Sequence, residues 1–207
     1  RGYRDFEDFL STFTAEKRKK AKRERRRVAE AGILFKRRFG HEATPDEIER
    51  AWQLHRRTFL QRGNEPYLNL EAFRQIAATM GEALQFTFAC LGDEIVAVAV
   101  FFVGKDTLYG RYWGSAEEYH SLHFETCYHQ GIEFCIERGL QRFEPGTQGE
   151  HKVSRGFAPT FTWSAHRIVE PRFRAAIADY LAREKIGVEQ YAAGIAEHVP
   201  YKQELAP

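Results

Sequence analysis

The middle of the chain carries short apolar runs separated by tight turns, which is the pattern of neighbouring β-strands. The runs occupy residues 85–91, 94–103 and 107–113, with Gly92 and Asp93 in the first turn and residues 104–106 in the second. The second run is apolar at almost every position, which is typical of a central strand buried on both faces. We therefore predict a three-stranded antiparallel meander.

Before the meander, apolar residues recur every three to four positions, which indicates helices. Thr44, Pro45 and Glu47 form a helix-start signal, because Thr44 can cap the helix and Glu47 can bond back to the cap. The predicted buried stripe of this helix consists of Ile48, Ala51, Trp52, His55 and Phe59. Further helices are predicted over residues 6–13 and 69–81, and a strand is predicted to start after Gly32.

After the meander, the pattern predicts a long helix over residues 120–138, a short strand over 140–144 and another strand over 160–169. A strand–helix–strand unit of this kind makes a right-handed crossover and a parallel pair. A final helix is predicted to begin at Pro171 and to bury Phe173, Ile177, Tyr180 and Leu181. The predicted fold class is therefore α/β with a mixed sheet.

Positive charge is concentrated at the start of the chain. Residues 1–30 carry 11 basic and 6 acidic side chains, whereas the 207-residue chain as a whole has a net charge of only +2. We predict a helical basic arm over residues 1–31 and one domain over residues 32–207. The run over residues 17–27 is expected either to bind tRNA or another polyanion, or to be an ordinary solvated helix.

Three cysteines without regular spacing argue against a disulfide framework and favour a reducing, cytoplasmic compartment. No apolar run reaches the roughly 20 residues that a transmembrane helix needs.

The chain begins with Arg1 and has one methionine, Met80, so we expect it to be part of a longer protein. His120, His123 and Cys127 could share a helix face, but a fourth ligand is not evident and no metal site is expected.

Several stretches of the chain together resemble one known family. They are LYGRYWGS at residues 108–115, LHFETCY at 122–128, FEPGTQGEHK at 143–152, RGF at 155–157 and TWSAH at 162–166. This set resembles the FemAB-like family, associated with peptidoglycan biosynthesis or recognition, within the GNAT acyltransferase superfamily. The resemblance implies a GNAT-like acyltransferase fold, covers most of the chain and implies an acyl- or aminoacyltransferase.

The polar, glycine-rich stretch over residues 144–155 is the first candidate site. Acyl transfer to an amine needs a base and a group that steadies the oxyanion. Glu150 or His151 is predicted to be the base, and Lys152 and Arg155 are predicted to hold a phosphate or the oxyanion. Gln148 is predicted to contact substrate. The alternative is a solvated turn with ordinary surface charge.

A second group of candidates lies on the third meander strand and the helix after it. Tyr112 and Trp113 are predicted to line a substrate groove, with core packing as the alternative. His123 and Glu125, at the start of the helix where a substrate could approach, are predicted to be catalytic.

Three hypotheses on function follow. The first is an acyl- or aminoacyltransferase that modifies an amine, with a peptidoglycan precursor as the acceptor. The second is a CoA-dependent N-acetyltransferase of a small molecule, and the third is a non-catalytic nucleic-acid-binding or recognition module. The resemblance implies that the pyrophosphate of acetyl-CoA would lie at residues 113–119, where Glu117 and Glu118 would repel it. Acetyl-CoA therefore fits poorly, and Fem-type enzymes instead use an aminoacyl-tRNA donor.

Overall fold

The computed structural model describes residues 2–146 and 149–202. The chain forms two compact units, of which unit 1 comprises residues 1–11 and 18–148 and unit 2 comprises residues 12–17 and 149–207. Neither limit coincides with the boundary that the sequence predicts after residue 31. A separate N-terminal domain therefore stays a prediction.

Unit 1 is built on a five-stranded sheet with strand order β1-β2-β3-β4-β5. Strands β1 to β4 are antiparallel neighbours, which confirms the predicted meander, and β4 and β5 form the predicted parallel pair. The fold class predicted from the sequence is thus confirmed. The strands are β1 (Ile33–Phe39), β2 (Leu84–Leu91), β3 (Glu94–Val103), β4 (Thr107–Ser115) and β5 (Arg142–Glu144).

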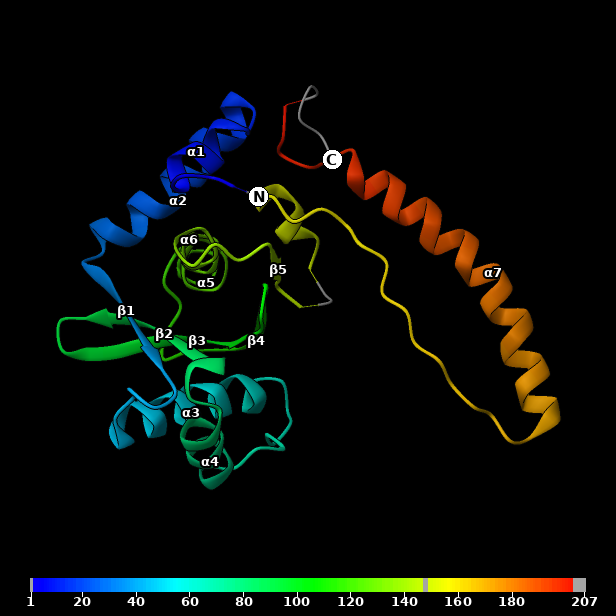
Figure 1. Ribbon diagram of the computed structural model, residues 1–207, viewed down its shortest axis with the longest axis horizontal. Helices are drawn as coiled ribbons and strands as arrows, with labels where there is room; N and C mark the ends of the chain where they lie inside the picture. The colour runs from blue at the N-terminus through cyan, green and yellow to red at the C-terminus, as the bar shows by residue number, and fades with distance from the viewer. Residues whose placement is uncertain (1, 147–148, 203–207) are drawn as a thin grey trace. The chain divides into compact units, whose positions relative to one another are not determined.

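Helices α3 (Pro45–Leu60) and α4 (Leu70–Met80) cover one face of this sheet (Figure 1). The predicted helix start is confirmed, because Thr44 and Glu47 form a reciprocal capping box at the N-terminus of α3. A short 3₁₀ turn, η1 (Gly81–Ala83), then leads into β2. The core on this face consists of Ile48, Ala51, Leu54, Phe73, Ala77, Leu84, Phe86, Phe88, Val98 and Val100.

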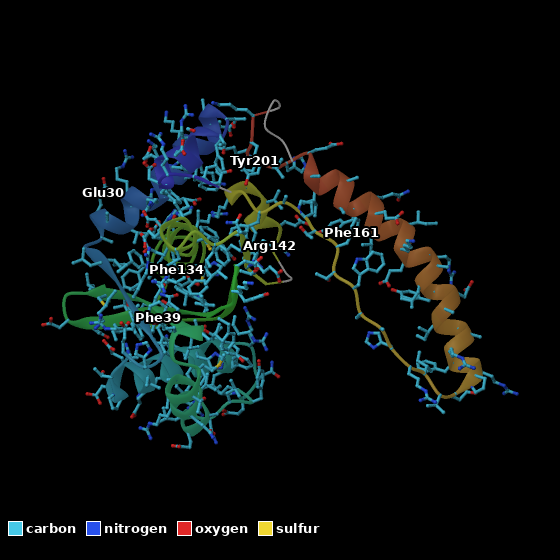
Figure 2. All side chains as sticks on the ribbon, in the orientation of Figure 1. Glu30, Phe39, Phe134, Arg142, Phe161 and Tyr201 are labelled. Carbon is cyan, nitrogen blue, oxygen red and sulfur yellow. The ribbon has the colours of Figure 1, made fainter. Side chains whose placement is uncertain are left out.

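The opposite face is covered by a helix of three consecutive parts (Figure 1). They are α5 (Leu122–Phe124), a π-helical turn η2 (Glu125–His129) and α6 (Gln130–Glu137). The helix predicted over residues 120–138 is therefore present but starts later and is interrupted by one wider turn. Phe134 of α6 packs against Phe39 of β1, with ring centroids 6.2 Å apart (Figure 2).

Helices α1 (Phe6–Ser11) and α2 (Ala15–Glu30) precede the sheet. From Arg18 onwards α2 belongs to unit 1, and Ala21, Glu24 and Val28 are buried. Most cations of the basic run thus lie on the solvent-facing side of a helix, whereas Arg25 is half-buried on its other side, so the run is not a free arm.

Unit 2 departs from two expectations. It contains the 3₁₀ helix η3 (Glu150–Arg155), an extended segment and the 26-residue helix α7 (Pro171–Ala196). The strand predicted over residues 160–169 is wrong, because that segment pairs with no strand. The predicted burial of Phe173, Tyr180 and Leu181 is also wrong, because α7 has no buried residue and these three are at least half exposed. An apolar stripe indicates which face of a helix can be buried, but not whether the chain supplies a surface to bury it.

Candidate functional site

Strand β4, which carries the predicted substrate-binding residues, continues past its parallel neighbour. β5 pairs with β4 only through Thr107, Leu108 and Tyr109, whereas β3 pairs along β4 as far as Ser115. In the part of the chain that the structure describes, no strand accompanies residues 111–115 on the β5 side. Strand pairing therefore leaves some backbone N–H groups along this edge without a strand partner. A ligand oxygen could accept hydrogen bonds from them.

Trp113 and His123 meet on the face covered by α5. Their ring centroids lie 5.2 Å apart in an edge-to-face arrangement, and His123 also contacts the ring of Tyr128. Both Trp113 and His123 are half-buried. The structure thus brings together two residues predicted from separate parts of the sequence, beside the open edge of β4.

Tyr112 lies on the opposite face of the sheet, against α3 and α4. Its hydroxyl is 2.9 Å from the hydroxyl of Tyr67, to which Arg111 Nη2 also donates at 2.9 Å. The ring of His55 packs on the ring of Tyr112 at 4.4 Å between centroids. Sequence reasoning missed Tyr67 and Arg111 and assigned His55 to the buried stripe, since no local pattern shows that all three contact Tyr112.

Glu125 is placed in a buried cluster of charged groups. Its carboxylate is 2% exposed and lies 2.9 Å from His129 Nδ1, 2.9 Å from Gln130 Nε2 and 3.2 Å from Arg25 Nε. Burial alone would raise the pKa of Glu125, but the hydrogen bond and charge of His129, the charge of Arg25 and the hydrogen bond of Gln130 hold that pKa below its usual value. These contacts describe a structural network that attaches α2 to the π-helical turn. The catalytic role predicted for Glu125 gains no support from them.

The third group of predicted residues lies in unit 2. The stretch expected to be an irregular loop contains η3, in which Glu150 and His151 are exposed and Lys152 is half-buried. Tyr191 of α7 donates a hydrogen bond of 2.7 Å to the Glu150 carboxylate. Arg155 is buried and donates to the carbonyl oxygen of His151 at 2.6 Å, so its guanidinium also stabilises the turn that carries it.

The surroundings of His151 favour its neutral form. Partial burial, followed by the charges of Arg155 and Lys152, lowers its pKa below the ordinary value of 6.5. The imidazole is therefore neutral near pH 7 and able to accept a proton. Gln148, the remaining predicted contact to substrate, lies outside the described residues.

The turn after β4 does not fit the pyrophosphate of CoA. Glu117 and Glu118 are both exposed there, and two carboxylates would repel the negative charge of a pyrophosphate. Across the described residues, no group of three or more His, Cys, Asp or Glu side chains could hold a metal ion. No helix in residues 2–146 and 149–202 is long and apolar enough to cross a membrane.

An antiparallel meander, a crossover helix and a fifth, parallel strand that parts from β4 form the mixed sheet of a GNAT-like acyltransferase fold. The chain belongs to the FemAB-like family, described as peptidoglycan biosynthesis/recognition, whose profile matches residues 1–203. No curated protein matches the sequence.

Several solved structures are similar to the chain. A possible acetyltransferase from Clostridium difficile 630 is 9% identical, with a TM-score of 0.49 over 67% of this chain and 99% of its own. An aminoglycoside acetyltransferase from an uncultured soil metagenomic sample, in complex with sisomicin, is 10% identical, with a TM-score of 0.49 over 68% and 99%. The C-terminal domain of a putative lysylphosphatidylglycerol synthetase from Agrobacterium fabrum is 16% identical, with a TM-score of 0.48 over 65% and 43%.

Proposed function

We propose that the protein is an acyl- or aminoacyltransferase that transfers an acyl group to an amine on a peptidoglycan precursor. The observation that carries the proposal is the open edge of β4 beside Trp113 and His123, in a chain of the FemAB-like family. Backbone N–H groups on such an edge can hold a carbonyl oxygen while negative charge develops on it. The aromatic ring of Trp113 offers an apolar surface for the bound substrate.

The amine acceptor must lose a proton when it attacks the acyl carbon. Within unit 1, His123 beside that edge is the proposed acceptor of the proton. Within unit 2, taken by itself, the alternative candidates are Glu150 or the neutral His151 as the base and Lys152 as the group that holds the anionic part of the donor. Since Glu117 and Glu118 do not fit a pyrophosphate, the proposed donor is an aminoacyl-tRNA rather than acetyl-CoA.

Glu150→Gln and Lys152→Ala are each expected to lower transfer from charged tRNA to an amine acceptor by roughly a hundredfold, because a contact to the transition state is lost. Glu150 is exposed and Lys152 is half-buried, and neither belongs to a packed core, so the free energy of unfolding should change by less than about 0.5 kcal/mol. Single-turnover transfer of a labelled amino acid and urea unfolding measure the two effects.

Tyr191→Phe is the matched control, because it removes the hydrogen bond to Glu150 and keeps the carboxylate. It should keep most of the transfer activity. Full activity in both test variants, or unfolding of both, would show that η3 is only structural.

The solvent-facing side of α2 is the proposed contact to the tRNA. Lys19, Lys20, Arg23 and Arg26 are exposed and recur at helical spacing, opposite the buried side of the helix. Replacing all four with Gln should weaken tRNA binding. If each cation contacts a phosphate, the slope of log K against the logarithm of the salt concentration should become shallower by about 3. Filter binding from 50 to 200 mM salt measures both.

A control for charge alone replaces four exposed cations from other elements, Arg57, Lys105, Arg172 and Arg174, which have no ion pair among the described residues. This variant has the same net charge as the test variant. Equal losses of binding in the two variants would show that only overall charge matters and that α2 is no specific contact.

A further inference from the structure

The cluster around the Tyr67 hydroxyl has features of a ligand site that the proposed acyl transfer does not use. Arg111 and Tyr112 are neighbours in β4, so in a regular strand their side chains would point to opposite faces. Here Val100 pairs with Tyr112 and Phe101 with Gly110, which leaves Arg111 as the extra residue of a β-bulge. The bulge explains why both side chains reach the same hydroxyl.

The cluster has donors that its own members do not use. Tyr67 and Tyr112 have two hydroxyl hydrogens but share one hydrogen bond, and Tyr67 also accepts from Arg111. One of the two phenolic O–H groups therefore does not donate within the Tyr67–Tyr112 hydrogen bond and can donate to a ligand. Arg111 uses one of its N–H groups on Tyr67 and forms no ion pair with any described residue.

Below these groups lies a histidine whose polar atoms are unused. His55 is 1% exposed, and neither ring nitrogen has a hydrogen-bond partner among the described residues. Its ring is enclosed by Phe59, Phe73 and Tyr112. Leaving buried polar atoms unpaired destabilises a fold, and such violations are expected at functional sites.

The charge of the cluster follows from these surroundings. Burial, and then the charge of Arg111, lower the pKa of His55 to about 4, so its imidazole is neutral near pH 7. Burial and the hydrogen bond with Tyr67 raise the pKa of Tyr112 to about 12, so its hydroxyl stays protonated. Nearby Arg56 is paired with Glu65. Arg111 thus supplies an uncompensated positive charge beside a phenolic donor, with Tyr67 and Arg111 exposed to solvent.

We infer that Arg111, Tyr67 and Tyr112 bind a carboxylate, and that the acceptor is an amine that also carries a carboxylate group, as in an amino acid or a peptide. The guanidinium fork and a phenolic O–H suit the planar oxygens of a carboxylate. The identity of the acceptor rests on the proposed transfer function, whereas carboxylate binding by the cluster does not.

Two probes with the same amine test the inference without any turnover. They are glycylglycine and glycylglycine amide, titrated into the full chain and followed by NMR chemical-shift changes. Glycylglycine should bind about tenfold more tightly than its amide, because only the free dipeptide offers a charged acceptor. Arg111→Gln should remove this difference and leave the affinity for the amide unchanged.

Arg62→Gln, which removes an exposed cation from the nearby α3–α4 connection, should leave the difference intact. Equal affinity of the wild type for both probes, no saturable binding of either probe, or a preference that survives Arg111→Gln would each overturn the inference. Urea unfolding of Arg111→Gln shows whether the cluster only attaches the α3–α4 connection to β4, in which case stability falls without any effect on the probes. Binding without transfer would contradict the proposed function alone, and transfer to amines regardless of a carboxylate would contradict this inference alone.

Discussion

Replacing Gly114 with alanine is expected to destabilise unit 1 by about 3 kcal/mol. A Cβ at this position would lie 2.6 Å from the backbone nitrogen of His55 and still closer to the backbone of Leu54. These atoms belong to helix α3 and cannot rotate away as a side chain can, so the helix would have to move off β4. Urea unfolding followed by circular dichroism measures the loss.

Two other glycine-to-alanine substitutions serve as controls for the stability loss expected of Gly114→Ala. A Cβ at Gly131 would meet the ring of Phe143, a side chain that can partly adjust, so Gly131→Ala should cost less. Gly187 lies within α7 with nothing nearby, and Gly187→Ala should be neutral or slightly stabilising because alanine favours helix. If Gly114→Ala is as stable as Gly187→Ala, the close approach of α3 to β4 described above is wrong.

The second large effect is expected from Arg25→Met. Arg25 contacts Glu125 through Nε at 3.2 Å and binds both carboxylate oxygens of Glu133 at 3.1 and 3.0 Å. Methionine keeps an apolar contact with the ring of Phe6, which the guanidinium overlies at 4.3 Å. It removes one of the two positively charged partners of the buried Glu125, the other being His129, and breaking a buried ion pair typically costs about 3–5 kcal/mol.

A double-mutant cycle separates the charge from the packing. Glu125→Gln in the Arg25→Met background should recover part of the lost stability, because no buried charge then remains unpaired. Arg26→Met, which removes only an exposed pair with Glu30, should change stability by less than about 0.5 kcal/mol. Additive effects of the Arg25 and Glu125 substitutions would show that the two groups do not interact.

The same pair predicts a pH dependence. The pKa of Glu125 in the folded protein lies below the ordinary value of 4.5, so its ionised form stabilises the fold above about pH 4.5. That contribution is lost as the pH falls through the lower, folded pKa. In Arg25→Met the folded pKa rises, so the free energy of unfolding of the variant should fall less between pH 4.5 and 3 than that of the wild type.

Local sequence patterns, such as capping residues, turns and apolar periodicity, predicted the elements of unit 1 well and those of unit 2 poorly. The capping box of Thr44 and Glu47 and the turns of the meander are set by neighbours in the chain, and the structure has them where they were predicted. The apolar side of α7 can be buried only if another part of the protein packs against it, and the spacing of apolar residues along the helix does not show whether such a surface exists. The strand predicted over residues 160–169 likewise needs a neighbouring strand that the sequence cannot supply by itself.

For the candidate site, residue type and position predicted Trp113 and His123, which the structure brings together. Arg111 and Tyr67 could not be predicted, because a bulge of one residue decides where Arg111 points and no periodicity encodes it. Glu125 and His123 are close in sequence, but their surroundings differ. Two partners of Glu125, His129 and Gln130, follow it closely in the chain, whereas Arg25 comes from α2, about one hundred residues earlier.

The three tryptophans divide between the units in a way that makes each unit optically distinct. Trp163 is 86% exposed in the extended segment of unit 2, whereas Trp52 and Trp113 are half-buried in unit 1. Trp52 also donates its indole N–H to the carbonyl of Leu68, and Trp113 packs on His123. In Trp163→Phe, fluorescence excited at wavelengths that only tryptophan absorbs therefore comes from unit 1 alone, at positions beside α4 and the open edge of β4.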